Sequence, residues 1–138
     1  NLDLRGLNLR GANLADASFV NTDLSEANLH DAHLSGAKLI NTRLSGTNFT
    51  LAKMNGAYIQ NCELTPETNL TGVDCDYIYT RLPTQDNPDP YRQPRVDGRR
   101  FKPGELNQLL LSFSTQGTPQ GELHNVDTMQ RTQQNFKK

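Results

Sequence analysis

The stretch DLSEANLHDAHLSGAKLINTRLSG, residues 23 to 46, places a leucine at every fifth position. These leucines are Leu24, Leu29, Leu34, Leu39 and Leu44. Five residues turn an α-helix by about 500°, so the side chains would not form the single stripe that an amphipathic helix buries. In a long strand, successive leucines would alternate between the two faces. The chain must therefore bend once in each five-residue unit.

Each unit divides into a short extended part and a corner. If the leucine is position i, position i−2 is small or restricted, as in Ala27, Ala32, Ala37 and Thr42. The side chains at i−2 and i are therefore expected to face inward, and the residue between them to face solvent. Position i+2 is glycine, asparagine or aspartate in most units, and these residues suit a corner because they tolerate a positive φ or form local hydrogen bonds.

The pattern continues without a break through thirteen units. Position i is occupied in turn by Leu4, Leu9, Leu14, Phe19, Leu24, Leu29, Leu34, Leu39, Leu44, Phe49, Met54, Ile59 and Leu64. A fixed period of this length is typical of a solenoid. A second period of twenty is carried by two sets of asparagines, Asn21, Asn41 and Asn61, and Asn8, Asn28 and Asn48. Because twenty is four fives and stacked asparagines form ladders, this spacing predicts four sides per coil.

Runs such as NLRGANLADASF and NLHDAHLSGAKL resemble the pentapeptide repeat family, whose consensus is A(D/N)Lxx. The resemblance covers residues 1 to about 80 and implies an all-β fold, a right-handed quadrilateral β-helix, here of about four coils. The segments CDYIYTRLP and RRFKPGEL resemble the C-terminal segment that follows the repeats in some bacterial members. The chain is accordingly divided into a β-helix over residues 1–82 and a C-terminal extension over residues 83–138.

The end of the solenoid is predicted from two irregularities. After Leu64 the register slips by one residue at Pro66, and the extra residue is expected to bulge from one side without ending the coil. Thr80 is a poor inward residue, and it is followed by Leu82 and a proline. We therefore expect the solenoid to end near residue 82.

The C-terminal extension begins and ends with polar sequence. Residues 83 to 104, PTQDNPDPYRQPRVDGRRFKPG, contain five prolines and alternating charges with little to bury, which is typical of an ordered wrap or a linker. Residues 118 to 138 are rich in Gln, Thr and Asn and are predicted to be a polar tail. A weak helix within this tail is expected around Leu123, Val126 and Met129.

A short amphipathic helix is predicted between these segments, over about residues 104–114. Leu106, Leu109, Leu110 and Phe113 follow the i, i+3, i+4, i+7 spacing of one helix face. An open solenoid end exposes its core and needs a cap. The helix is therefore expected to cover the last coil, with docking on a partner or on a second copy as the alternative.

The opposite end of the solenoid starts in mid-pattern, with Leu2 already at an inward position. A first coil with nothing over it would leave apolar surface in water. The expectation is that this chain is the C-terminal part of a larger bacterial protein. The alternative is that something else covers this end, including a second copy in a homodimer.

Composition bears on cellular location. The sequence has no apolar run of eighteen residues and no signal-like segment, so no membrane association is expected. Cys62 and Cys75 both fall on inward positions, which favours buried thiols over a disulfide and thus a reducing compartment. The predicted location is cytoplasmic.

Catalysis and metal binding are not indicated by the residues. The sequence shows no constellation of Ser, His and an acid, and no phosphate-binding loop. His30, Asp31 and His33 come nearest to a metal site, but the two histidines flank a corner and are interpreted as solvated surface. No cofactor, no metal and no catalytic residue is predicted, and the protein is not expected to be an enzyme.

Nucleic-acid binding is not expected either. One basic cluster is present, consisting of Arg92, Arg95, Arg99, Arg100 and Lys102. The formal net charge of the chain is −1, whereas nucleic-acid-binding domains tend to be basic overall.

The family resemblance raises the opposite alternative, a DNA mimic that binds a type II topoisomerase through an acidic rod. Residues 1–82 contain nine acidic and six basic residues, a net charge of −3, which is weakly acidic for such a role. Arg43 also interrupts the row formed by Asp3, Asp23 and Glu63.

An outward apolar stripe is the candidate interaction surface. Val20 and Ile40 at i+1 and Tyr58 at i−1 fall on one side of the solenoid, while Leu51 stands alone on another. Such a stack either packs coil against coil or binds a partner. The prediction is a structural or protein–protein interaction module with an unidentified protein partner, contacted through Val20, Ile40 and Tyr58, and the topoisomerase-directed mimic is the alternative.

Overall fold

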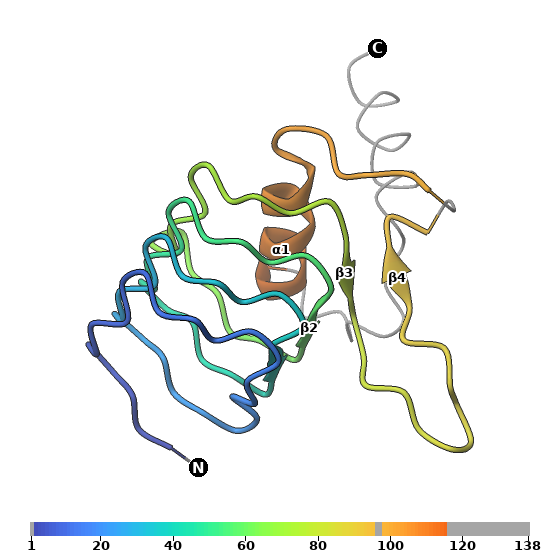
Figure 1. Cartoon of the computed structure of the whole chain (residues 1–138), viewed down its shortest axis with the longest axis horizontal. Helices are drawn as coiled ribbons and strands as arrows, with labels where there is room; N and C mark the ends of the chain where they lie inside the picture. The colour runs from blue at the N-terminus through green and yellow to red at the C-terminus, as the bar shows by residue number, and fades with distance from the viewer. Residues whose placement is uncertain (1, 96–97, 116–138) are drawn as a thin grey trace.

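The chain winds into a β-solenoid whose coils lie side by side (Figure 1). The computed structural model describes residues 2–95 and 98–115. Parallel bridges join residues twenty apart, for example Asp3 to Asp23, and successive bridges begin five residues further along the chain. Four bridges therefore complete one circuit, and the four-sided coil predicted from the twenty-residue period is confirmed.

One side of the solenoid forms a four-stranded sheet in the order β1-β2-β3-β4. Its strands are β1 (Lys38–Ile40), β2 (Ala57–Gln60), β3 (Ile78–Tyr79) and β4 (Arg92–Gln93), and the helix α1 (Glu105–Thr115) follows. The first three strands are parallel, as coils wound in one direction require, whereas β4 is antiparallel to β3. The repeats thus supply three strands, and the C-terminal extension supplies the fourth.

The corners are made by residues with a left-handed backbone at position i+2. The non-glycine residues among them have φ between 53° and 63° and are Asp16, Asn21, Glu26, Asp31, Asn41, Leu51 and Asn61. A backbone hydrogen bond closes most corners, as from the Leu7 N–H to the Leu4 carbonyl at 3.2 Å. Side chains also stack between coils, since the Asn41 amide donates to the Asn21 Oδ1 at 3.1 Å. The predicted asparagine ladder is thereby observed.

Pro66 explains the single irregular corner among the repeats. A proline ring fixes φ near −65°, so Pro66 cannot take the left-handed conformation that position i+2 requires. The corner contains one residue more, and the bridge from Asn48 reaches Asn69, twenty-one residues further on. The Thr65 N–H donates to the Thr68 hydroxyl at 3.1 Å across this wider corner. The predicted one-residue slip is confirmed.

The core is the file of inward side chains from all four sides. Leu24, Leu29 and Leu39 have no exposed surface, and small residues such as Ala32 fill the i−2 positions beside them. The first coil packs against only one neighbouring coil, and Leu2 is 58% exposed.

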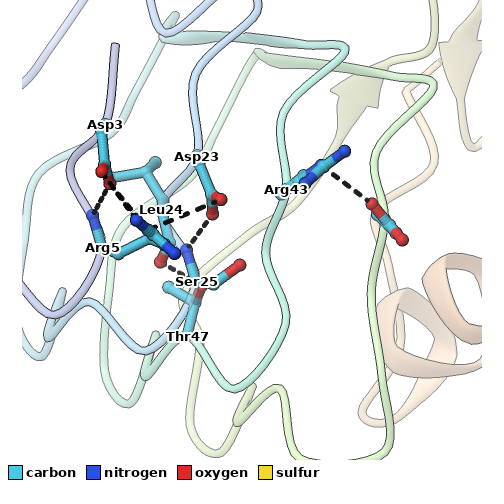
Figure 2. A network of polar contacts seen from close by, with 8 residues as sticks. Asp3, Arg5, Asp23, Leu24, Ser25, Arg43 and Thr47 are labelled. Atoms are coloured by element: carbon cyan, nitrogen blue, oxygen red, sulfur yellow. Dashed lines mark hydrogen bonds and ion pairs between the residues drawn. The ribbon is translucent and has the colours of Figure 1, made fainter.

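Inward threonines also donate hydrogen bonds from their hydroxyls to backbone carbonyls of the preceding coil. The Thr47 hydroxyl donates to the Leu24 carbonyl at 2.8 Å, twenty-three residues back (Figure 2), and the Thr42 hydroxyl donates to the Phe19 carbonyl at 2.9 Å. Both threonines are at position i−2 and are at most 2% exposed. These bonds add side-chain links to the backbone ladder inside an otherwise apolar interior.

Cys62 and Cys75 are both free thiols, as predicted. The Cys62 thiol donates to the Leu39 carbonyl at 2.8 Å, in the manner of the inward threonines. Burial raises the pKa of Cys62 to about 12 and that of Cys75 to about 12, because a thiolate would lose its hydration inside the solenoid.

The C-terminal end of the solenoid differs from the prediction in two ways. Thr80 was expected to be a poor inward residue, but it is only 2% exposed, and its hydroxyl finds a partner in the Tyr91 carbonyl at 3.2 Å. Residues 83 to 104 were expected to bury little, yet they fold back as β4 and bury Gln93 to 4% exposure. The wrap is therefore part of the sheet and closes its edge.

The predicted helix is present as α1, with both ends one residue further along the chain than expected. Leu106, Leu109 and Leu110 belong to the hydrophobic core, and α1 packs at the end of the solenoid away from the N-terminus (Figure 1). The side chain of Phe113 and the tail with Leu123, Val126 and Met129 lie outside the described residues.

A buried carboxylate fixes the start of α1. Glu105 is 3% exposed, and its carboxylate accepts hydrogen bonds from the Lys102 N–H at 2.6 Å and from the Arg99 guanidinium at 2.8 Å. The backbone N–H of Glu105 donates to the Lys102 carbonyl at 3.0 Å. The bond from the Lys102 N–H is one half of a capping box, in which a glutamate at the start of a helix satisfies the backbone N–H three residues before it.

We expect Thr47→Val to lower the free energy of unfolding by about 1 kcal/mol, because it removes a buried hydrogen bond between coils at nearly constant volume. The Leu24 carbonyl still accepts from the Ala27 N–H at 3.0 Å, so no acceptor is left unpaired. Urea unfolding followed by circular dichroism measures the change. Thr22→Val is the matched control, since the Thr22 hydroxyl makes only a local 3.3 Å contact with the Val20 carbonyl. Equal losses in the two variants would contradict this role.

The thiols of Cys62 and Cys75 should resist alkylation in the folded protein. With a pKa of about 12 for each, the thiolate fraction at pH 8 is on the order of 10⁻⁴. Burial restricts access to Cys62 further, whereas Cys75 is half-buried. Mass spectrometry after iodoacetamide treatment should find little label without urea and two labels per chain in urea. Fast labelling of the native chain would show that the thiols are accessible.

Removal of the buried cap should weaken the C-terminal end of the protein. Glu105→Ala is expected to cost about 3 kcal/mol, because it breaks a buried ion pair with Arg99 and the bond to the Lys102 N–H. Glu63→Ala is the control, since the pair of Glu63 with Arg43 at 3.4 Å is exposed and should contribute under about 1 kcal/mol. Urea unfolding of both variants tests the difference, and similar losses would rule out a special role for Glu105.

Candidate interaction surface

The four-stranded sheet presents a row of aromatic and basic side chains at its outward positions. The register aligns Lys38 with Tyr58, Tyr58 with Tyr79, and Tyr79 with Arg92. Each is half-buried. We call these four residues, together with the adjacent Tyr77, the tyrosine row.

The rings of the tyrosine row contact one another in sequence. The Tyr58 and Tyr79 ring centroids are 5.0 Å apart with an interplanar angle of 32°, and Tyr77 meets Tyr79 edge-on at 5.7 Å. The Arg92 guanidinium carbon lies 4.8 Å from the Tyr77 centroid, and the Lys38 Nζ lies 6.0 Å from that of Tyr58. Both cations are within the range at which an aromatic ring attracts positive charge. The row is therefore a continuous chain of contacts with a cation at each end.

Tyr77 reaches this row because the neighbouring corner is a glycine. Tyr77 lies at the corner position of the last repeat, and the Gly56 N–H donates to its carbonyl at 2.9 Å. A Cβ on Gly56 would approach the Tyr77 Oη to 3.3 Å, so the bare backbone of Gly56, with φ of 71°, leaves room for the ring. Glycine at position 56 thus leaves the space that the Tyr77 ring occupies.

The charges of the row are not compensated by the residues that the structure describes. Among the residues that the structure describes, none forms an ion pair with Lys38 or Arg92, although Arg92 also donates to the Pro94 carbonyl at 2.7 Å. Desolvation raises the pKa of Tyr79, with a further contribution from Tyr77. The Tyr79 hydroxyl is thus neutral at physiological pH, and it can donate and accept hydrogen bonds.

The predicted contact residues do not all reach the surface. Tyr58 lies at the centre of the tyrosine row, and Val20 is half-buried at i+1 on the same side. Ile40 was expected to be an outward apolar residue, but it is only 7% exposed. It lies between Val20 and Gln60 on neighbouring coils. Ile40 is therefore a packing residue, and its prediction as a surface contact is corrected.

Sequence reasoning missed Tyr77, Tyr79 and Arg92. Tyr79 could have been found, because it follows Tyr58 by twenty-one residues, which is the coil period plus the one-residue slip. Arg92 could not, because it comes from β4, which has no repeat pattern. The sequence signal that does exist is an aromatic residue at the same outward position on successive coils.

A different side of the solenoid carries the acidic row, and this row is charge-compensated (Figure 2). Arg5 forms two bonds of 2.9 Å with Asp3 and lies 4.0 Å from Asp23, while Arg43 lies 3.4 Å from Glu63. The hydrogen bond from Arg5 lowers the pKa of Asp3 to about 2. The polar groove of about 530 Å³ on this side is therefore lined by both signs of charge.

The predicted basic cluster is dispersed by pairing with acids. Arg95 lies 3.3 Å from Asp89, and Arg99 is buried against Glu105 at 2.8 Å. Arg92 belongs to the tyrosine row instead. The residues that are near one another in sequence therefore do not make one positive surface.

His30 precedes the corner at Asp31 and His33 follows it, so the two histidines lie on different sides of the coil. His33 bridges to Asn13, and the His30 ring lies 3.2 Å from Asp31. In residues 2–95 and 98–115, no three His, Cys, Asp or Glu side chains gather closely enough to hold a metal ion. Within the same residues, no helix has both the length and the apolarity to cross a membrane.

Solved structures similar to this chain include three proteins with the same type of repeat. HetL of the cyanobacterium Nostoc sp. strain PCC 7120, a protein involved in heterocyst differentiation regulation, is 29% identical with a TM-score of 0.29 over 52% of this chain and 35% of its own. A thylakoid lumen protein of Arabidopsis thaliana is 27% identical with a TM-score of 0.21 over 62% of this chain and 70% of its own. Rfr23 of the cyanobacterium Cyanothece 51142 is 20% identical with a TM-score of 0.18 over 54% of this chain and 87% of its own.

The chain thus spans about a third of the length of HetL, and no curated protein sequence matches it significantly. The family model described as the pentapeptide repeat region matches residues 1–70, which is half of the chain. This match covers the five-residue units whose inward leucines and left-handed corners build the solenoid, and the chain belongs to the pentapeptide repeat family.

Proposed function

We propose that this chain is a non-enzymatic protein-interaction module, built as a right-handed solenoid of about four coils, whose partner binds at the tyrosine row. Pentapeptide repeat proteins are generally structural or interaction modules. The observation that carries the proposal is the pair of cations, Lys38 and Arg92, which lie at the two ends of a half-exposed tyrosine stack and form no ion pair with any described residue. Aromatic and arginine side chains are the residues on which binding energy concentrates at protein interfaces.

Coil-to-coil packing accounts for only part of this arrangement. Stacked tyrosines stabilise neighbouring strands, as cross-strand aromatic pairs do. Packing gives no reason for placing Lys38 and Arg92 at the two ends of the stack without acidic partners. Charges placed in this way are suited to binding an anionic group of another molecule.

The alternative, a DNA mimic directed at a type II topoisomerase, has less support. A mimic presents carboxylates in place of phosphates. Here arginines lie within 4.0 Å of Asp3, Asp23 and Glu63, and the neutralised row offers little phosphate-like charge.

Tyr58→Glu should abolish partner binding without unfolding the protein, because it puts a carboxylate into the middle of the row. The native chain, Tyr58→Glu and Lys53→Glu are used as parallel baits in affinity capture from a cell lysate, after circular dichroism has confirmed that all three are folded. Lys53→Glu is the matched control, since Lys53 occupies the same outward position on another side of the solenoid. A partner held by the native and Lys53→Glu chains and lost by Tyr58→Glu is the expected result. Equal capture by all three would refute binding at the tyrosine row.

A further inference from the structure

We propose that the tyrosine row binds an extended acidic peptide that runs across the strands, with two carboxylates four residues apart and an apolar residue midway between them. This inference rests on the proposed function and names the chemistry of its partner. Three features of the row carry it, namely its charge, its length and the orientation of its rings.

The charge of the surface selects an anionic partner. The outward positions on this side, over the described residues from Ser18 to Arg92, hold Lys38, Arg81 and Arg92 and no carboxylate. Arg81 is occupied, because it donates to the Asp89 carbonyl at 2.6 Å and stacks on Tyr91 at 3.9 Å. Lys38 and Arg92 form no ion pair with any described residue, so a carboxylate can approach each of them without displacing another.

The length of the row fixes the spacing of the two carboxylates. Lys38 and Arg92 are separated by three strand-to-strand steps, and each step is about 4.8 Å, which gives about 14 Å. An extended peptide advances about 3.4 Å per residue, so two residues four apart span about 14 Å as well. Residues at i, i+2 and i+4 of an extended peptide point the same way. The middle residue therefore faces Tyr58 and Tyr79.

The orientation of the rings favours a peptide over a single-stranded nucleic acid. Bases bind proteins by stacking on free aromatic faces. The faces of Tyr58 and Tyr79 are turned toward each other at 5.0 Å, and one face of Tyr77 is covered by Arg92 at 4.8 Å. One face of each ring is therefore already in contact within the protein, while the ring edges and hydroxyls can contact apolar side chains and donate hydrogen bonds to a peptide backbone.

Fluorescence anisotropy with dye-labelled peptides tests the proposal on the full chain. The probe has the core Glu-Ser-Leu-Ser-Glu. One control peptide has the core Gln-Ser-Leu-Ser-Gln, and a second has the rearranged core Glu-Ser-Leu-Glu-Ser, which puts the carboxylates on opposite sides of an extended chain. The probe should bind most tightly of the three, and its affinity should fall as salt rises from 0.05 to 0.5 M because the contacts are exposed ion pairs.

Charge reversals on the protein locate the site. Lys38→Glu and Arg92→Glu should each weaken probe binding about fivefold or more, since each replaces an attractive pair by a repulsive one. Lys53→Glu, which makes the same change on another side, should leave binding unchanged. A probe with lysine in place of one glutamate should bind Lys38→Glu better than it binds the native chain. This gain cannot come from a misfolded variant.

Three outcomes would overturn the acidic-peptide proposal. These are equal binding of the rearranged peptide, equal losses in Lys53→Glu and Lys38→Glu, and tighter binding of labelled oligothymidylate than of the probe. If no acidic peptide binds while capture by the native chain is still lost in Tyr58→Glu, the partner has another chemistry and the interaction module stands. If capture also fails to depend on Tyr58, both proposals fall.

Discussion

The left-handed corner residue is the constraint on which the whole solenoid depends. A chain that turns once every five residues needs a tight corner in each unit, and here a residue with a positive φ makes most of these corners. Glycine, asparagine and aspartate meet this need at low cost, but Glu26 and Leu51 also adopt it, with φ of 63° and 60°. Pro66 cannot adopt a positive φ, and the corner at Pro66 contains one additional residue. The last corner position is Tyr77, which is not left-handed, and the regular path ends one side later.

Because the corners fix the register, each side of the solenoid presents a separate file of outward residues. Residues twenty apart become neighbours, so the character of a side is set by its file and not by local sequence. Asp3, Asp23, Arg43 and Glu63 make a file in which opposite charges meet. The tyrosine row is a file of the opposite kind, with aromatic rings in contact and with charges that form no ion pair with any described residue. The difference between these sides is the physical basis for proposing the tyrosine row, and not the acidic row, as a binding surface.

The sequence predicts the repetitive part of this structure well, because period five and period twenty are properties of the backbone path. The inward leucines, the four sides, the slip at Pro66 and the helix near residue 105 all follow from local patterns. β4 could not be predicted, since a two-residue strand has no periodicity and pairs only because the edge of β3 is open. The burial of Ile40 was missed for a related reason. An outward position in the repeat does not ensure exposure for a residue that lies between two neighbouring coils.

The candidate surface lies where the repeats stop and the cap begins, and it contains residues from both. Tyr58 and Tyr79 belong to repeats, whereas Arg92 belongs to β4 and is held in place by its pairing with Tyr79. Beyond β4, the Arg99 pair with Glu105 anchors α1, whose leucines join the core. A solenoid needs a cap to protect its last coil. Here the cap also completes the row by supplying its second cation, so the stability of the C-terminal end and the shape of the recognition surface are set by the same contacts.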